Sequence, residues 1–212
     1  YATVIESALE RFVLRQTSLV PHGLRFYGGT FSETLTVLHR DADLRALAAA
    51  PAALRDCYCA VPLRGCTALH DAVAQFVQHM ANDAAAAAAC NTVECVLCIV
   101  TDGADNSSTR CDADGMRRLL DAKRAGGGWR IFMLGTDDID VRGMAEQRGV
   151  GRAAALTIGR TPTETDAAFD SVCAGLQRVR LGQDAEPTFT ADERDHAYRG
   201  PGGGSATETT TT

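Results

Sequence analysis

A short oxygen-bearing motif, Thr101-Asp102-Gly103, directly follows an apolar run at residues 96–100. Such a run of Val, Leu and Ile predicts a strand that is buried on both faces, as in the interior of a parallel sheet. Ligands of open α/β sheets bind at the carboxyl ends of the strands, so the carboxylate of Asp102 is a candidate for a binding site. The plainer alternative is that Asp102 only caps the turn before the next helix.

A second polar segment, at residues 65–71, reads Gly-Cys-Thr-Ala-Leu-His-Asp. Gly65 indicates a turn, and Thr67 is a suitable N-cap for the helix that follows. The apolar stripe of this helix comprises Leu69, Val73, Phe76, Val77 and Met80. His70 and His79 fall outside the stripe, so we expect them to face solvent rather than to bind a ligand.

Strands and helices alternate through the second half of the chain, which predicts a doubly wound, mostly parallel sheet flanked by helices. The expected strands lie near residues 93–100, 129–135 and 153–158, and the last helix lies at 167–181. In the first half we expect a helix at 2–16, an antiparallel hairpin of strands 24–31 and 34–39, a short helix at 41–50 and an extended piece at 57–61.

Composition and charge exclude several classes of function. The chain has 212 residues, a net charge of −6 and no cluster of Lys and Arg, which argues against a nucleic-acid partner. No apolar run approaches the roughly 20 residues that span a membrane. The spacing of the eight cysteines fits no zinc motif, so we predict reduced thiols in an intracellular, cytoplasmic protein, with a disulfide framework as the alternative. Motifs for nucleotide binding and for an α/β-hydrolase nucleophile are missing from the sequence.

The chain divides into one folded domain and a tail. Residues 1–181 carry the periodic pattern, and residues 182–212 predict a disordered, low-complexity tail because the pattern fades and Gly and Thr accumulate. The chain opens with Tyr1 on a segment that is already helical, which suggests a fragment of a longer protein.

The segments at residues 65–72 and 100–106, in this order on one predicted sheet, resemble the second and third loops of a von Willebrand factor A domain. Residues 128–135, Gly-Trp-Arg-Ile-Phe-Met-Leu-Gly, are similar to the strand after the third loop in small stand-alone intracellular members of that family. The resemblance covers about residues 2–181. It implies a Rossmann-like α/β fold and a metal-ion-dependent adhesion site at the carboxyl edge of the sheet.

The resemblance also implies roles for individual residues. Thr67 and Asp102 would be ligands of Mg²⁺ or Mn²⁺, which prefer hard oxygen donors. Asp71, one helical turn after Thr67, would support the loop without touching the metal. Thr101 and Gly103 of the loop would be supporting residues as well. Asp105 and Ser107 are weaker candidates for metal ligands, and we expect them to serve as loop or cap residues.

The sequence departs from the family pattern in one important respect. The first strand of the family and its Asp-x-Ser-x-Ser loop have no counterpart in this chain. The loss of that loop would remove three metal ligands, and the loss of the strand would expose two strand edges. We therefore expect impaired metal binding in this chain, together with marginal stability or a tendency to aggregate.

Three functions follow from these observations. The leading hypothesis is a non-enzymatic protein-binding module that, in its complete form, captures a carboxylate of a partner protein through a Mg²⁺ bridge. The second is a degenerate, metal-independent scaffold domain. The third is a metal-dependent hydrolase that uses Asp102 and a His, and it is the weakest because the sequence shows no pairing of a base with a nucleophile.

Overall fold

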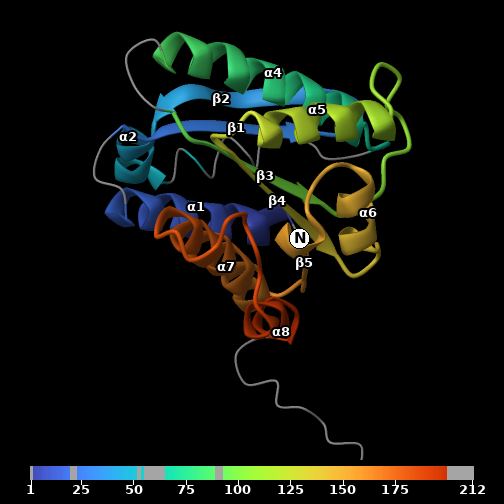
Figure 1. Cartoon of the computed structure of the whole chain (residues 1–212). Helices are drawn as coiled ribbons and strands as arrows, with labels where there is room; N and C mark the ends of the chain where they lie inside the picture. Colours follow the sequence, from blue (N-terminus) through green and yellow to red (C-terminus); the bar gives the residue numbers. More distant parts are fainter. Residues whose placement is uncertain (1, 20–22, 52–53, 55–64, 89–92, 200–212) are drawn as a thin grey trace, which may run out of the picture.

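The computed structural model describes residues 2–19, 23–51, 54, 65–88 and 93–199, and it places strands between two layers of helices (Figure 1). Helices α4 (Leu69–Ala88) and α5 (Ala113–Ala125) lie on one side of the strands. Helices α1 (Ala2–Leu19) and α7 (Pro162–Arg180) lie on the other. This α/β arrangement confirms the predicted fold class.

Three parallel strands form the larger sheet, in the order β3 (Cys95–Thr101), β4 (Trp129–Thr136) and β5 (Ala155–Ile158). Helix α5 connects β3 to β4, and helix α6 (Val141–Gln147) with the short 3₁₀ turn η1 (Arg152–Ala154) connects β4 to β5. Gly127 and Gly128 have φ angles of 72° and 75°, a left-handed conformation that Gly tolerates best, and they turn the chain from α5 into β4.

The strands β1 (Arg25–Phe31) and β2 (Leu35–Asp43) form a separate antiparallel hairpin, as predicted, followed by α2 (Leu44–Ala49). Within the described residues, β1 pairs with β2 and β3 pairs with β4, and no ladder joins the two sheets. The loops that follow β1 and β3 nevertheless meet the same segment, because Ala68 N–H donates to Ser32 O over 2.6 Å and Asn106 N–H donates to Thr67 O over 2.9 Å. The absence of a first family strand stays a prediction.

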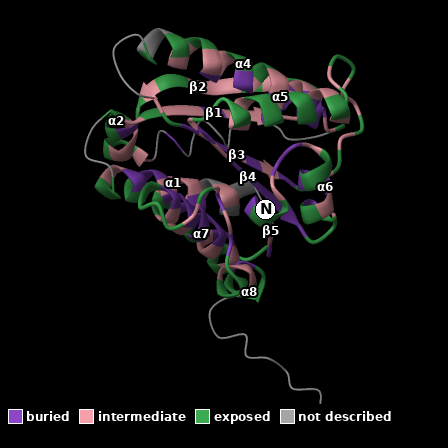
Figure 2. Cartoon of the chain, in the orientation of Figure 1, coloured by how far each residue is buried: buried purple, intermediate pink, exposed green. Residues whose placement is uncertain are grey.

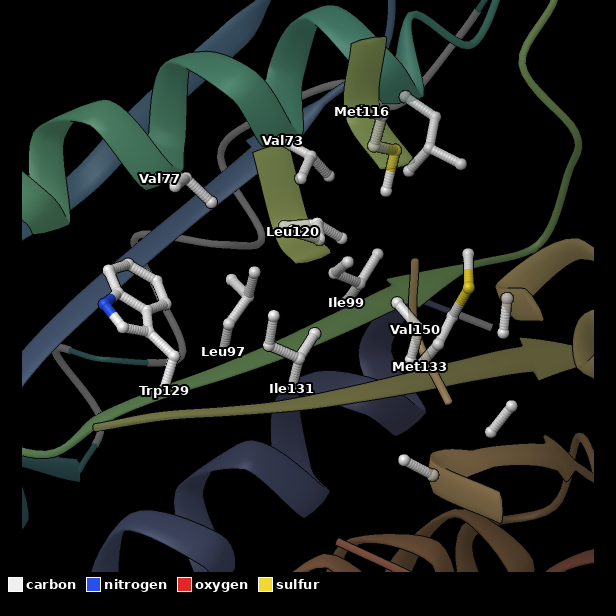
Figure 3. Packing of buried hydrophobic residues seen from close by; sticks show 14 of the residues in the cluster. Val73, Val77, Leu97, Ile99, Met116, Leu120, Trp129, Ile131, Met133 and Val150 are labelled. Carbon is white, nitrogen blue, oxygen red and sulfur yellow. The ribbon is translucent and has the colours of Figure 1, made fainter. Parts of the chain in front are cut away.

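Two clusters of buried hydrophobic residues lie on the two faces of the parallel sheet, and a smaller third cluster joins Val13 of α1 to Leu44 and Leu54. Toward α4 and α5, side chains of β3 and β4 meet those of the helices (Figure 3); the cluster includes Leu97, Ile99, Ile131, Met133, Val73, Val77, Met116 and Leu120. Toward α1 and α7, the cluster includes Phe132, Leu134, Leu156, Ile158, Phe169 and Val172. Strand β4 is therefore buried on both faces (Figure 2).

The prediction that β3 is buried on both faces is only half right. Cys95, Leu97 and Ile99 are buried on the face toward α4, whereas the side chains that alternate with them are only partly buried, namely Val96, Cys98 and Val100. An apolar run in a sequence shows that a strand avoids water, but it does not show whether neighbouring elements cover both of its faces.

Helix α8 (Ala191–Arg199) corrects the predicted boundary between the domain and its tail. Residues 182–199 are ordered, so the prediction of disorder from residue 182 is wrong for this part, and residues 200–212 lie outside the described residues, as does the piece at 57–61. The guanidinium of Arg194 donates to Ala153 O over 2.8 Å and to Ala155 O over 2.5 Å, and Gly159 N–H donates to Ala197 O over 2.8 Å. Helix α8 thereby covers the outer edge of β5.

The sequence pattern missed α8 because few apolar residues anchor it. Phe189 and Ala197 are buried, while most of the helix is charged or polar and exposed. The helix is held by the bonds of Arg194 to backbone oxygens and by an ion pair of Glu193 with Arg178 of α7, and such contacts leave no periodic signal in the sequence. In the described part of the chain, no helix is long and apolar enough to cross a membrane.

Candidate functional site at the carboxyl edge of the strands

Thr67 lies against the loop that follows β3, and Asn106 of that loop holds it there. The N–H of Thr67 donates to Oδ1 of Asn106 over 2.6 Å, and the N–H of Asn106 donates to the carbonyl of Thr67 over 2.9 Å. A Cβ atom built on Gly103 would lie 3.6 Å from Oγ1 of Thr67, so the hydroxyl of Thr67 faces the backbone of Gly103. The structure thus brings together the two segments that the sequence analysis selected.

The loop itself is shaped by Thr101, whose side chain is buried. Its hydroxyl donates to Gly103 O over 2.8 Å and accepts from Gly103 N–H over 3.3 Å. The hydroxyl of Thr136, at the end of β4, lies 3.5 Å from Asp102 O. These contacts hold the backbone on both sides of Asp102, so the direction in which its side chain leaves the loop is well defined.

Asp102 is exposed, and within the described residues its carboxylate accepts no hydrogen bond. The N-cap of the following helix α5 is Asp112, which accepts from Gly115 N–H over 2.6 Å. Because the carboxylate of Asp102 accepts no hydrogen bond from the described residues, the alternative that Asp102 only caps the turn before this helix is wrong. Asp102 remains a carboxylate that the fold presents at the edge of the sheet without using it.

Asp71 binds the far side of the loop with an unusually complete set of contacts. Its carboxylate accepts from the N–H groups of Thr109, Arg110 and Cys111 over 2.9, 3.0 and 2.7 Å. Its own N–H donates to Oγ of Ser108 over 3.0 Å. Burial alone would raise the pKa of Asp71, but the three N–H groups stabilise the carboxylate, and the net pKa lies below the ordinary value.

Asp105 contacts both helix α4 and its own loop. Its Oδ2 accepts from His70 N–H over 3.0 Å and from the Ser108 hydroxyl over 2.5 Å, and its Oδ1 accepts from Ser108 N–H over 3.3 Å. Burial would raise its pKa, yet these donors lower the pKa of Asp105 below the ordinary value. In the described residues the Ser107 hydroxyl is buried without a hydrogen-bond partner.

His70 corrects the sequence analysis, because it is 6% exposed and not a solvent-facing residue. Its Nε2 accepts from Nε of Arg148 over 2.9 Å, and its Nδ1 lies 3.5 Å from Oδ2 of Asp105. The apolar stripe of α4 could not predict this, since the groups that compensate for the burial of His70 come from distant parts of the chain. Asn106, Ser108 and Arg148 were missed for the same reason.

The donor set suits a hard divalent cation in type but not in number. Thr67 and Asp102 offer one hydroxyl and one carboxylate, whereas Mg²⁺ takes six oxygen ligands. In the described part of the chain, no group of three or more His, Cys, Asp and Glu residues could hold a metal ion. The described residues therefore do not complete a metal site.

The geometry also bears on the hydrolase hypothesis. Both ring nitrogens of His70 have a charged neighbour: Nε2 accepts from Arg148, and Nδ1 faces Asp105. The nearby Ser108 hydroxyl donates to Asp105 and not to a histidine. Because a nucleophile needs a base that takes its proton, this cluster does not form a Ser–His pair.

Comparisons with solved structures identify the fold as that of a von Willebrand factor A domain. A von Willebrand factor type A protein from Catenulispora acidiphila matches 82% of this chain with a TM-score of 0.55 and 15% identity. Proximal thread matrix protein 1 from the mussel byssus matches 78% with a TM-score of 0.53 and 13% identity. A further structure of that mussel protein, described as having a zinc-occupied MIDAS motif, matches 78% with a TM-score of 0.52 and 14% identity.

These matches confirm the resemblance in fold. Their sequence identities are too low to assign a function. The matched regions span 38%, 40% and 41% of the lengths of the three solved chains. No family model and no curated protein sequence matches this chain. The chain thus has the von Willebrand A fold.

Proposed function

We propose that the chain is a protein-binding module whose binding edge contains Thr67 and Asp102. One observation carries the proposal: Asn106 holds the backbone of Thr67 so that the Thr67 hydroxyl lies beside Gly103, while the adjacent Asp102 carboxylate is exposed and accepts no hydrogen bond from the described residues. Asp71 of α4 braces this loop from outside, and Asp105 of the loop itself binds the N–H of His70 at the start of α4. The Thr67 hydroxyl and the Asp102 carboxylate are held in place by the fold, and their oxygens are left to bind an external ligand.

In a complete form of the domain, this pair would be part of a divalent cation site for Mg²⁺ or Mn²⁺. A cation with few anionic protein ligands keeps open positions, and the carboxylate of a partner protein can fill one of them. The zinc-occupied MIDAS motif of the mussel protein supports this proposal by analogy of fold. With Thr67 and Asp102 alone, this chain should bind a cation only weakly.

The test is a titration of the chain with Mn²⁺, followed by the paramagnetic relaxation of water protons, for the wild type and for Asp102→Ala. We expect weak binding by the wild type, with a Kd in the millimolar range, and its loss in the variant. Asp114→Ala, which removes another exposed carboxylate from the first turn of α5, is the matched control and should bind like the wild type. Equal binding by the wild type and Asp102→Ala would refute the metal site.

The second candidate is a scaffold domain that binds its partner without a metal. The small number of oxygen ligands favours it, since the described residues do not complete a shell. Capture of a partner by a longer form of the chain separates the two: sensitivity to EDTA and to Asp102→Ala supports the metal bridge, and indifference to both supports the scaffold. Among the described residues, Cys66, Cys95, Cys98, Cys111 and Cys173 have free thiols, which supports the proposed intracellular location.

A further inference from the structure

A row of three polar side chains, of which His70 is buried and Asp105 and Arg148 are half-buried, connects elements that are far apart in the sequence. His70 is the second residue of α4, Asp105 lies in the loop after β3, and Arg148 is the C-cap of α6. The 2.9 Å bond from Nε of Arg148 to Nε2 of His70 and the 3.5 Å approach of Nδ1 to Oδ2 of Asp105 place the imidazole between a cation and an anion.

The partners of His70 determine where its proton resides. A guanidinium can only donate hydrogen bonds, so Nε2 must be the unprotonated nitrogen and the proton must be on Nδ1, which faces Asp105. Only the neutral imidazole can accept from Arg148 on one side while it presents an N–H to Asp105 on the other. A second proton, on Nε2, would remove the acceptor and place two cations in contact.

The two outer side chains, Arg148 and Asp105, each bind a segment of backbone. Arg148 donates from Nη1 to Met144 O over 3.2 Å, and its N–H donates to Ala145 O over 3.0 Å, so its position is tied to the last turn of α6. Asp105 fixes Ser108 through the hydroxyl and the N–H. His70 therefore connects three parts of the fold: the loop after β3, the start of α4 and the end of α6.

We propose that His70 is an acid-sensitive latch: a proton from solvent that binds Nε2 breaks the bond from Arg148 and releases the end of α6 from the loop at residues 105–108. This inference does not depend on the proposed function, because it needs neither a metal nor a partner. It concerns the same loop that presents Asp102, so the latch would also alter the binding edge if that edge is functional.

The surroundings of His70 set the pH range. Burial lowers the pKa of His70 most, the carboxylate of Asp105 raises it, and Arg148 lowers it, with a net pKa below the ordinary value. Asp71, Arg110, Cys111, Asp112 and Arg118 are the other charged or titratable groups around it, on α4, the loop and α5. His70 and Asp105 both line an open depression of about 580 Å³ at the surface.

The sign follows from these shifts. Because the folded state holds the proton on His70 less tightly than the unfolded state, stability from the neutral ring is full above the unfolded pKa of about 6.5. It is lost as the pH falls from there through the lower folded pKa. The pKa values of Asp71 and Asp105 lie below their ordinary values, so these carboxylates titrate at lower pH and do not obscure the transition.

Hydrogen exchange of the whole chain tests the latch, with protection factors corrected for the intrinsic effect of pH. Between pH 7.5 and pH 5, protection should fall about tenfold at residues 144–150 and 105–108 and should be unchanged in β4. His70→Gln keeps a neutral acceptor for Arg148 and should abolish the pH response. His39→Gln is the matched control, since burial also lowers the pKa of His39, on the remote strand β2, and this variant should respond like the wild type.

A measurement on the unaltered chain protects the test against a variant that fails to fold. A titration of the histidine C–H protons by NMR should give His70 a midpoint below that of a free histidine, with chemical-shift changes at residues 144–150 at the same midpoint. A constant protection of residues 144–150 across this range in the wild type would overturn the proposal. So would an unchanged response in His70→Gln.

Discussion

The backbone of Thr67 and the loop residue Asn106 form a two-way clamp across the carboxyl edge of the strands. Asn106 accepts from Thr67 N–H over 2.6 Å and donates its own N–H to Thr67 O over 2.9 Å. The bond from Thr67 N–H needs the amide side chain of Asn106, and the bond to Thr67 O holds the backbone of Asn106. The clamp therefore depends on the identity of one residue in the loop.

Replacing Asn106 by Ala should lower the free energy of unfolding by about 1–2 kcal/mol, because Thr67 N–H loses its acceptor. Equilibrium unfolding in urea measures this loss. Asn82→Ala on α4 is the control, since Asn82 contacts Gln78 only at the surface; its effect should stay within about 0.5 kcal/mol. A similar, small effect of both substitutions would show that the clamp does not stabilise the fold.

Asp71→Asn should cost about 1–3 kcal/mol at pH 7, because a neutral amide has one acceptor oxygen for N–H groups that now share two. The pKa of Asp71 is lowered in the folded state, so its contribution is present above the unfolded pKa of about 4 and is lost as the pH falls through the folded pKa. The stability of the variant should thus depend less on pH below pH 4 than that of the wild type. Urea unfolding at pH 7 and pH 3 compares the two slopes.

Metal ions should have little effect on the stability of this chain. If the Kd for Mg²⁺ is about 10 mM, then about 10 mM Mg²⁺ adds only about 0.4 kcal/mol, and EDTA changes nothing measurable. Differential scanning calorimetry with and without Mg²⁺ would show a shift of Tm of about 2 °C at most. A shift of about 10 °C would mean that residues outside the Thr67 and Asp102 pair complete the site.

Ala197→Glu should detach α8, because a carboxylate cannot be accommodated at a position that is 0% exposed. We expect a loss of about 1–3 kcal/mol and exposure of the β5 edge. Asp192→Asn, at an exposed position of the same helix, should be nearly neutral. Unfolding in urea measures the loss of stability. Light scattering at increasing protein concentration shows whether the exposed β5 edge promotes association.

Local sequence patterns and one topological rule are enough to predict the parallel sheet, the hairpin and the meeting of the two polar segments. Apolar runs that end in Thr101 and a helix that begins after Thr67 place both segments at one edge of the sheet. The same patterns do not reveal contacts between polar residues that are distant in sequence. The burial of His70 depends on Arg148, 78 residues later, and no periodicity relates the two.

The boundary of the domain shows the same limit. Helix α8 has a pattern that resembles a solvated segment. It is attached by bonds from Arg194 to the backbone oxygens of Ala153 and Ala155 and by the ion pair of Glu193 with Arg178 of α7. Hydrogen bonds of this kind are specified by the geometry of the finished fold. The buried Phe189 is the one large apolar residue that could have indicated that the tail begins later than residue 182.

The division of the strands into two sheets has a consequence for cooperativity. In the described part of the chain, the β1–β2 hairpin shares no ladder with β3 and contacts the core of the parallel sheet through apolar side chains such as Tyr27 and Phe31. A unit connected in this way can open with a smaller free energy than the whole domain. The hairpin should therefore behave as a separate folding unit, whose amides exchange before those of β4 under conditions in which the rest of the domain is intact.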